Sequence, residues 1–176
     1  MSGVSIRPAT PEDAAALLGI YAHYVANTAV SLEIAVPTQA EFAERIRSTL
    51  ARYPYLVLEE DGLIRGYAYA GPFKARAAYA HSCEWSIYLD PGARGRGFGR
   101  RLYEAMEPRL REAGFVNLYA CIADPVREDE YLTHASERFH RRLGFTRVGT
   151  FRGCACKFGR WYNMIYMEKI LVEHGT

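Results

Sequence analysis

The sequence predicts an α/β (α+β) fold in which helices cover a mixed sheet, within one domain spanning residues 1–176. Segments of helical and strand periodicity alternate along the chain. Both hairpin turns and longer crossovers connect the strands, so the sheet should contain antiparallel and parallel pairs. The composition, 49% hydrophobic and 24% charged, is that of a globular domain able to bury a core.

Capping residues define the predicted helices. Thr10 precedes the first helix, and Thr38 with Glu41 forms a capping box for the second. Gly114 and Gly144 are predicted C-caps of the third and fourth helices, because glycine tolerates the left-handed conformation found there. The predicted helices cover residues 11–25, 40–52, a stretch around 102–113, and 133–143.

Short apolar runs define the predicted strands. The first hairpin turns at Asp61-Gly62, a dipeptide typical of two-residue turns. Residues 27–37 have no clear periodicity and are predicted to be irregular. Residues 152–162 are predicted to form a long basic connection between the last two strands. The predicted strands are residues 4–7, 55–59, 64–70, 81–89, 116–122, 145–152 and 161–169.

Charge and hydropathy restrict the possible partners. A net charge of +2 gives no overall case for a nucleic-acid partner. No apolar run approaches the roughly 18 residues needed for a membrane span, and no secretory leader is evident, so we expect a cytoplasmic protein with no membrane partner. The four cysteines are scattered without a CxxC motif. We therefore expect reduced, mostly buried thiols and no metal site.

The segment WSIYLDPGARGRGFGRRL, residues 85–102, carries the strongest functional signal. An apolar strand leads into a loop of alternating Arg and Gly, and a helical pattern follows. Free amides at a helix start, together with the helix dipole, bind phosphate groups. The spacing matches neither the P-loop nor the GxGxxG dinucleotide motif. It instead reads Arg-x-x-Gly-x-Gly at Arg94, Gly97 and Gly99.

This loop resembles the acetyl-CoA loop of the GCN5-related N-acetyltransferase (GNAT) superfamily. The helix carrying His140, followed by Leu143, Gly144 and Phe145, resembles a later motif of the same superfamily. The resemblance implies a central sheet of six to seven strands, splayed at the acetyl-CoA cleft and covered by about four helices. It also implies acetyl-CoA as the co-substrate.

Three further segments are similar to the phosphinothricin and methionine sulfoximine N-acetyltransferases within that superfamily. They are residues 20–33, 70–91 and 157–164. The similarity implies an N-acetyltransferase that acts on the amino group of a small amino-acid-like substrate, an activity associated with herbicide resistance. It also implies a homodimer.

The resemblance assigns the acetyl-CoA contacts to the strand, the loop and the later helix. Thr133 stands near the place where relatives have an asparagine, after an acidic insertion, and we expect it to replace that contact. The predicted cofactor-binding residues are Ile87, Tyr88, Leu89, Arg94, Gly95, Arg96, Gly97, Phe98, Gly99, Arg100, Thr133 and Ser136.

Two residues are expected to carry the chemistry. Glu84 matches the glutamate that the phosphinothricin enzymes use as a base, and it can remove a proton from the acceptor amine. The alternative is an ion pair with Arg76 or Lys74. Because Glu84 and Leu89 should alternate to opposite faces, the resemblance implies a bulge in this strand. His140 is expected to donate to the leaving thiolate or contact CoA, or simply to pack in the core.

The acceptor pocket is expected to be lined by the first helix and the loop after it, by residues 73–84 and by residues 157–162. Guanidinium and phenol groups suit an amino acid carrying anionic groups. The aromatic side chains of residues 158–162 can alternatively be core or dimer contacts. The predicted substrate-binding residues are Tyr21, Glu33, Arg76, Tyr79, Lys157 and Trp161.

We expect direct attack of the amine on the thioester within a ternary complex. Cys121 is the candidate for a covalent relay in a ping-pong alternative. Two other functions remain open at this point. One is acetylation of peptide or protein N-termini, and the other is a CoA-binding sensor without catalytic activity.

Overall fold

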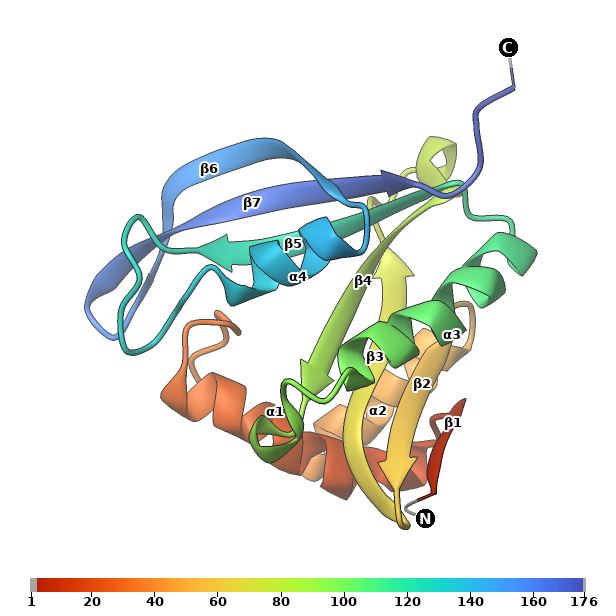
Figure 1. Cartoon of the computed structure of the whole chain (residues 1–176), viewed down its shortest axis with the longest axis horizontal. Helices are drawn as coiled ribbons and strands as arrows, with labels where there is room; N and C mark the ends of the chain where they lie inside the picture. The colour runs from red at the N-terminus through yellow and green to blue at the C-terminus, as the bar shows by residue number, and fades with distance from the viewer. Residues whose placement is uncertain (1–2, 176) are drawn as a thin grey trace.

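A computed structural model describes residues 3–175, and in that range seven strands form one mixed sheet in the order β1-β2-β3-β4-β5-β7-β6 (Figure 1). The strands are β1 (Val4–Pro8), β2 (Tyr55–Glu60), β3 (Leu63–Pro72), β4 (Ser82–Leu89), β5 (Asn117–Asp124), β6 (Thr146–Lys157) and β7 (Arg160–Ile170). The helices are α1 (Ala14–Asn27), α2 (Gln39–Leu50), α3 (Phe98–Glu112) and α4 (Ala135–Arg142). The expected fold class is confirmed.

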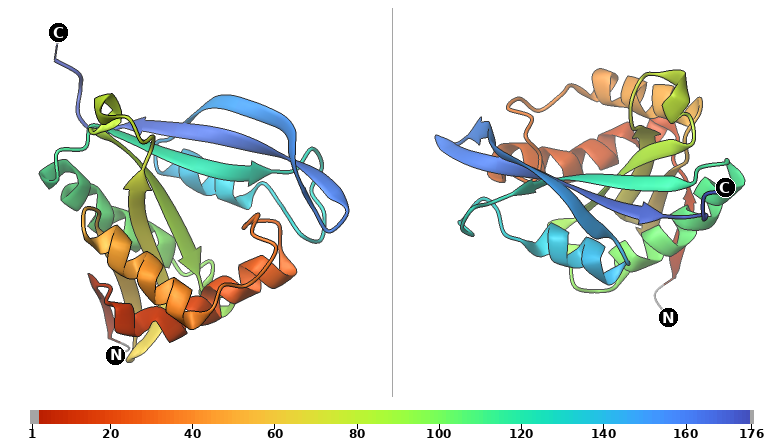
Figure 2. Two further views of the ribbon diagram at one scale, coloured as in Figure 1. Left: turned by 180° about the vertical axis from the view of Figure 1, so that it is seen from behind. Right: turned by 90° about the horizontal axis from the view of Figure 1, so that it is seen from above.

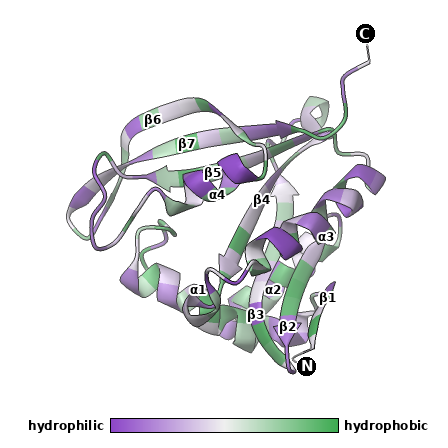
Figure 3. Cartoon of the chain, viewed as in Figure 1, coloured by the Kyte–Doolittle hydropathy of each residue, from purple (hydrophilic) through white to green (hydrophobic). Residues whose placement is uncertain are grey.

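The helices cover both faces of the sheet (Figure 2). Helices α1 and α2 pack on one face of β2–β4, in a core cluster that contains Leu17, Phe42 and Tyr67. Helix α3 packs on the other face, where Leu102 and Met106 belong to a second cluster. The outer sides of α3 and α4 are hydrophilic (Figure 3). Helix α3 therefore buries one apolar stripe against the sheet.

The sheet opens between its two halves. Strands β4 and β5 run parallel and pair at only three positions, from Ser82 opposite Asn117 to Glu84 opposite Tyr119. Beyond Glu84, β4 continues to pair with β3 while β5 continues to pair with β7. The two strands therefore diverge and leave a V-shaped gap (Figure 1). Glu84 stands at the apex of this gap.

Two expectations about the strands are wrong. The register of β4 against β3 runs without interruption from Cys83 to Leu89, so β4 has no bulge in its pairing with β3. Divergence from β5, rather than a bulge, opens the cleft. The last two strands are also longer than predicted, because β6 extends to Lys157 and turns directly into β7. Phe158 and Gly159 make this tight turn, both with positive φ (53° and 71°).

The predicted helix caps hold at most positions. Thr38 accepts from the backbone N–H of Glu41 at 3.2 Å, and the Glu41 carboxylate accepts from the Thr38 N–H at 2.7 Å. Gly114 and Gly144 follow α3 and α4 with φ of 84° and 90°. The first helix differs at its start: after Thr10 the chain forms a 3₁₀ turn over Pro11–Asp13, and α1 begins only at Ala14.

Candidate active site

Two cavities meet in the gap between β4 and β5. The inner cavity is lined from β4 by residues 85–88, from β5 by residues 120–123, and by Val30, Leu132, Ser136 and His140. The outer groove runs toward the Arg-Gly loop. It is lined by Tyr24, Val30, Ile87, Leu89, Arg94, Gly95, Thr133, Ala135, Ser136 and Phe139. Val30, Ile87 and Ser136 line both, so the two spaces are neighbours along β4.

The Arg-Gly loop is shaped by its own backbone. Asp90 accepts from the amide of Gly92 at 3.0 Å and starts a 3₁₀ turn over Pro91–Ala93. Gly95 and Gly97 then adopt positive φ of 74° and 81°, which strains any other L-residue. Gly97 is the N-cap of α3 and has no side chain to satisfy the first amides of that helix. These amides suit an anion beside the outer groove.

Gly99 has a packing role. A Cβ atom placed on this residue would lie 3.0 Å from the ring of Phe139. Glycine here lets α3 approach α4 closely beside the groove, so this glycine of the motif serves packing between the two helices.

The loop arginines separate into two groups. Arg94 lines the outer groove, with its guanidinium 5.1 Å from the ring centre of Tyr24. Arg96 forms a bidentate ion pair with Glu60, one contact being 2.8 Å, and Arg100 pairs with Glu104 at 2.7 Å. Among residues 3–175, Arg94 has no carboxylate within ion-pair distance. Arg94 is therefore the loop cation best placed to receive a phosphate.

The predicted cofactor residues only partly converge. The outer groove brings together Ile87, Leu89, Arg94, Gly95, Thr133 and Ser136. Tyr88 lines the inner cavity, but its ring packs on the α1–α2 face of the sheet. The centre of that ring lies 5.0–5.5 Å from the ring centres of Tyr21, Tyr24 and Tyr67. The residues that do not line either space are Arg96, Gly97, Phe98, Gly99 and Arg100.

Glu84 has one hydrogen-bond partner on a neighbouring strand. The hydroxyl of Tyr166, on β7, donates to Glu84 Oε1 at 3.0 Å. In the described part of the chain Glu84 forms no ion pair with Arg76 or Lys74, so the alternative ion-pair interpretation does not hold. Burial raises the pKa of the Glu84 carboxyl, and this effect outweighs the hydrogen bond from Tyr166 and the charge of Lys74.

Glu84 and the outer groove belong to opposite faces of the sheet. Leu89 and Ile87 pack with the α3-side cluster, whereas Tyr88 packs with the α1-side cluster, as alternation along β4 requires. The same alternation places Glu84 on the α1 side. A molecule in the groove and a molecule in front of Glu84 can therefore meet only through the gap where β4 and β5 separate.

His140, on α4, is buried against the rings of Trp85, Phe139 and Phe145. Its Nδ1 lies 2.7 Å from the carbonyl of Ser136, which accepts only, so this nitrogen carries the proton. Burial lowers the pKa of His140 to about 4. The imidazole is neutral at pH 7, and its Nε2 is a hydrogen-bond acceptor.

Phe73 connects the predicted residues on the 72–81 segment to Glu84. Tyr79 packs edge-on against Phe73 at 5.8 Å, and Phe73 in turn meets the ring of Tyr166 at 6.0 Å. Lys74 lies 5.6 Å from the Tyr166 ring centre. Arg76 is exposed on the same segment. Tyr79 and Lys74 are thus linked to Glu84 through Phe73 and Tyr166, whereas Arg76 is placed on the same segment only by its position in the chain.

Tyr21 and Glu33 form a separate polar group with Arg45. Tyr21 donates to Glu33 Oε2 at 2.6 Å, and Arg45 holds both carboxylate oxygens at 3.1 and 2.7 Å. Arg45 was not predicted, because it lies within a helix whose pattern indicates only a solvated face.

Lys157 and Trp161 do not line the spaces along β4. Lys157 is buried and donates from Nζ to the carbonyls of Val25 and Ser31, both at 2.7 Å. It ties the irregular segment after α1 to the β6–β7 hairpin. Trp161 is 67% exposed and borders a different hollow, with Val126, Arg147 and Asn163.

The cysteines differ from the expectation, since only Cys83 is buried and Cys121, Cys154 and Cys156 are exposed. Cys121 borders the inner cavity. Desolvation of its thiol, together with the charge of Glu84, raises the pKa of Cys121 to about 11. The thiol therefore stays protonated at neutral pH.

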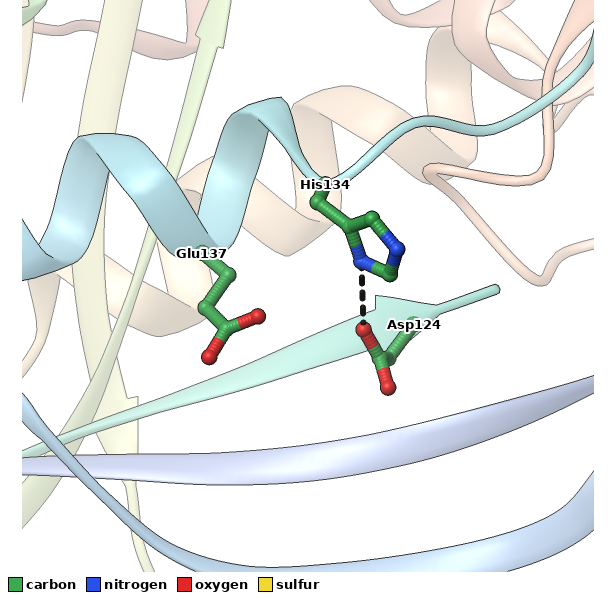
Figure 4. A group of neighbouring side chains, drawn as sticks. All are labelled: Asp124, His134 and Glu137. Carbon is green, nitrogen blue, oxygen red and sulfur yellow. Dashed lines mark hydrogen bonds and ion pairs between the residues drawn. The ribbon is translucent and has the colours of Figure 1, made fainter. Parts of the chain in front are cut away.

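One group of side chains has the composition of a metal site. Ligand atoms of Asp124, His134 and Glu137 lie within 4.8 Å of one another (Figure 4). His134 Nδ1 meets Asp124 Oδ1 at 3.0 Å. Arg147 approaches both carboxylates, at 3.5 and 3.6 Å, and Arg141 pairs with Glu137 at 2.8 Å. Guanidinium groups already balance the carboxylates, so this group ties the start of α4 to β5 and β6, and we assign no metal to it.

Three site residues escaped the sequence interpretation. Tyr24 donates to the carbonyl of Leu89 at 2.5 Å and stacks under Arg94. Tyr166 binds Glu84, and Val30 borders both spaces. Tyr24 lies three residues after Tyr21 on an apolar helix face, and Tyr166 lies on a strand four residues after Tyr162. Neither spacing separates these tyrosines from core residues.

Comparison with known proteins gives a consistent result. A family model described as the acetyltransferase (GNAT) domain matches residues 6–166. A phosphinothricin N-acetyltransferase from Streptomyces coelicolor is 36% identical over 172 residues, which cover 96% of each chain. An L-methionine sulfoximine/L-methionine sulfone acetyltransferase from Salmonella typhimurium is 34% identical over 174 residues, covering 98% of each chain.

A solved structure extends the comparison to the fold. The GNAT superfamily phosphinothricin acetyltransferase from Sinorhizobium meliloti, crystallised with acetyl-CoA, aligns with a TM-score of 0.87 at 34% identity. The alignment covers 95% of this chain and 88% of that one. None of the helices within residues 3–175 has the length and apolar character needed to cross a membrane.

Proposed function

The chain belongs to the GNAT family of acetyl-CoA-dependent N-acetyltransferases, and from this premise we propose that its acceptor is the amino group of a small amino-acid-like compound. We further propose that the amine attacks directly within a ternary complex. The observation that carries both proposals is the gap between β4 and β5, which opens at Glu84 and borders the groove beside Arg94.

The residues of the outer groove fit acetyl-CoA. Arg94 and the free amides at the start of α3 match the charge of a pyrophosphate, and the apolar edge of β4 at Ile87 and Leu89 matches a pantetheine arm. Acetyl-CoA supplies a thioester as the acyl donor. Tyr24 fixes the carbonyl of Leu89 and supports Arg94, so it positions two walls of this groove.

Glu84 is proposed as the base. An α-amine has a pKa of about 8 and arrives largely protonated near neutral pH. The raised pKa of Glu84 brings its carboxylate closer to the basicity needed to remove that proton, directly or through one water. Tyr166 holds the carboxylate at the apex of the gap, where β4 and β5 stop pairing.

His140 and Cys121 support a mechanism without a covalent relay. A protonated Cys121 thiol is a poor nucleophile, because the thiolate is the reactive form. The neutral His140 offers Nε2 as an acceptor rather than an imidazolium proton. We therefore propose that His140 orients a thiol or a water in the inner cavity.

Steady-state kinetics test this function. We expect thiol release from acetyl-CoA with methionine sulfone or phosphinothricin as acceptor, and intersecting initial-rate lines when both substrates are varied. Parallel lines, together with loss of activity in Cys121→Ala, would contradict direct attack. Release only with peptides would indicate an N-terminal acetyltransferase. Tight CoA binding without release on a broad amine panel would indicate a sensor.

We also propose that the chain forms a homodimer through the β6–β7 side. Large apolar side chains are exposed there, with Val126 at 81%, Phe151 at 54% and Trp161 at 67% exposure. Sedimentation equilibrium of the wild type and of Trp161→Glu tests the proposal, because a charge in the interface should shift the population toward monomer.

A further inference from the structure

Glu60 is a buried carboxylate that the proposed chemistry does not use. It is the last residue of β2, directly before the Asp61-Gly62 turn, and is only 6% exposed. A glutamate buried to this extent normally has a charged partner, because an unpaired charge loses its hydration. The partners of Glu60 therefore indicate what a carboxylate does at this position.

Arg96, in the Arg-Gly loop, is the main partner of Glu60. Its two terminal guanidinium nitrogens each contact one oxygen of Glu60, and the contact from Nη1 to Oε2 is 2.8 Å. The same guanidinium lies 4.7 Å from the ring centre of Phe98, the first residue of α3. A bidentate ion pair fixes the orientation of a guanidinium as well as its position. The end of β2 thus holds the loop at Arg96.

Arg65, on β3, is the second partner and contacts the other end of the loop. Its Nε lies 3.5 Å from Glu60 Oε2, within ion-pair distance but without hydrogen-bond geometry. Its Nη1 donates to Asp90 Oδ2 at 3.1 Å, and its carbonyl accepts from the Asp90 N–H at 2.8 Å. Asp90 Oδ1 in turn accepts from the amide of Gly92. The β2–β3 hairpin therefore holds both ends of the loop, Asp90 through Arg65 and Arg96 through Glu60.

The contact at Arg96 is important because this part of the loop is rich in glycine. Gly95 and Gly97 flank Arg96, and glycine has more backbone freedom than any other residue. Arg94, which lines the outer groove, precedes these two glycines, and the free amides of α3 follow them. Holding Arg96 restricts the loop to arrangements in which Arg94 and these amides face one anion together. Such preorganisation strengthens binding, because the ligand has less of the site to order.

We propose that Glu60 is a positioning residue for acetyl-CoA, which acts through Arg96 to hold the Arg-Gly loop in the conformation that receives the pyrophosphate. Glu60 lines neither space along β4, so its effect on the cofactor is indirect. The inference rests on the proposed placement of acetyl-CoA in the outer groove. Its sign is distinctive: removing a negative charge near a phosphate site strengthens binding by electrostatics alone, whereas loss of a positioning contact weakens it.

The test measures CoA binding by isothermal titration calorimetry in Glu60→Gln, which preserves the shape of the side chain. We expect the Kd for CoA to rise about tenfold, as for a released loop that occupies the binding conformation about one-tenth of the time. Glu59→Gln is the matched control, because it removes the same charge from the neighbouring residue, which pairs with Arg7 instead of the loop. Its Kd should change less than about twofold, since the lost charge makes no contact with the loop and is screened by salt.

A truncated acyl donor separates positioning of the pyrophosphate from a general loss of structure. S-Acetylpantetheine carries the thioester and the pantetheine arm but no phosphate. In Glu60→Gln, kcat/KM for acetyl-CoA should fall about tenfold, whereas kcat/KM for S-acetylpantetheine should stay within about twofold of the wild type. An equal loss with both donors would show a general structural role and overturn the proposal.

Two further variants keep the test decisive. Glu60→Asp retains the charge beside Arg65 but shortens the reach to Arg96, so the Kd for CoA should again rise, even if Glu60→Gln does not fold. Arg96→Gln should raise the Kd by the same factor as Glu60→Gln, and the double variant should be no worse than either single one. Tighter CoA binding in Glu60→Gln with weaker binding in Arg96→Gln would show that Arg96 contacts the phosphate itself, and would overturn the proposal. Unchanged CoA binding in Arg94→Ala would instead refute the placement of acetyl-CoA in the outer groove.

Discussion

The Tyr166 hydroxyl donates to Glu84 Oε1 at 3.0 Å, from β7 to β4, although β5 lies between these two strands in the sheet. The hydrogen bond lies at the last position where β4 and β5 pair, which is Glu84 opposite Tyr119. It holds the carboxylate at the apex of the gap. The hydrogen bond also opposes the effect of burial on Glu84, since it lowers the pKa that desolvation raises.

Replacement of the proposed base should change the pH profile. In Glu84→Gln, we expect kcat/KM at pH 7 to fall by about 10²-fold, within the usual range for loss of a general base. The deficit should shrink as pH rises past the amine pKa of about 8, because the acceptor then arrives deprotonated. Acetyl-CoA binding, measured by calorimetry, should persist. A constant deficit from pH 6 to pH 10 would exclude Glu84 as the base.

The Tyr166 contact makes a separate prediction. Removing its hydroxyl in Tyr166→Phe should raise the pKa of Glu84 further, so the acid limb of the kcat/KM profile should move to higher pH. The kcat/KM of the variant should be several-fold below that of the wild type at pH 6 and close to it at pH 9. Tyr119→Phe is the control, because Tyr119 is next to Glu84 but makes no hydrogen bond to it among the described residues. An unshifted acid limb would contradict the assignment.

The loop arginines should differ in their effect on the cofactor. Arg94→Ala removes the guanidinium that lines the groove, so the KM for acetyl-CoA should rise about tenfold or more while kcat and the acceptor KM change little. Arg100→Ala should have a smaller effect, because Arg100 is exposed and paired with Glu104. Initial rates at low and moderate salt provide the measurement. Equal effects of the two substitutions would show that the loop acts only through its total charge.

Much of the fold, and part of the groove proposed to bind acetyl-CoA, can be predicted from local sequence. The Thr38-Glu41 capping box, the Asp61-Gly62 turn and the Arg94-to-Gly99 loop each depend on residues adjacent in the chain. For these features a short motif determines the local backbone conformation, and the structure agrees closely.

The acceptor side depends on contacts that no local pattern reveals. The Tyr166–Glu84 bond joins residues 82 positions apart, and the bond from Lys157 to Val25 joins residues 132 apart. Lys157 was predicted to line the acceptor pocket, because residues 157–164 resemble a segment of the phosphinothricin and methionine sulfoximine acetyltransferases. Lys157 is buried because the β6–β7 hairpin lies beside the end of α1, and this contact depends on the tertiary fold.

Lys157 should accordingly contribute to stability rather than to substrate binding. In Lys157→Met, the carbonyls of Val25 and Ser31 lose their buried donor, at a cost of about 1–3 kcal/mol for each unsatisfied group. Urea unfolding should show a lower midpoint with an unchanged slope. The acceptor KM of the remaining folded enzyme should stay close to that of the wild type. A large increase in acceptor KM without loss of stability would restore Lys157 as a substrate-binding residue.

The ionisation of Glu107 should make the free energy of unfolding depend on pH in the acid range. Burial alone would raise its pKa, but hydrogen bonds from Tyr103, Arg111 and Lys169 outweigh burial and lower the pKa of Glu107 to about 2. A depressed folded-state pKa contributes stability above the unfolded value near 4.5, and that contribution disappears as pH falls toward 2.

Glu107→Gln should therefore lower the free energy of unfolding by about 2–3 kcal/mol at pH 7. The difference from the wild type should narrow between pH 4.5 and pH 2, where the wild-type carboxylate itself becomes protonated. Glu104→Gln on the same helix is the control, because the exposed Glu104–Arg100 pair should contribute less than about 1 kcal/mol. Urea titrations at several pH values measure both variants, and a pH-independent difference would show that the effect of Glu107→Gln comes from packing rather than from ionisation.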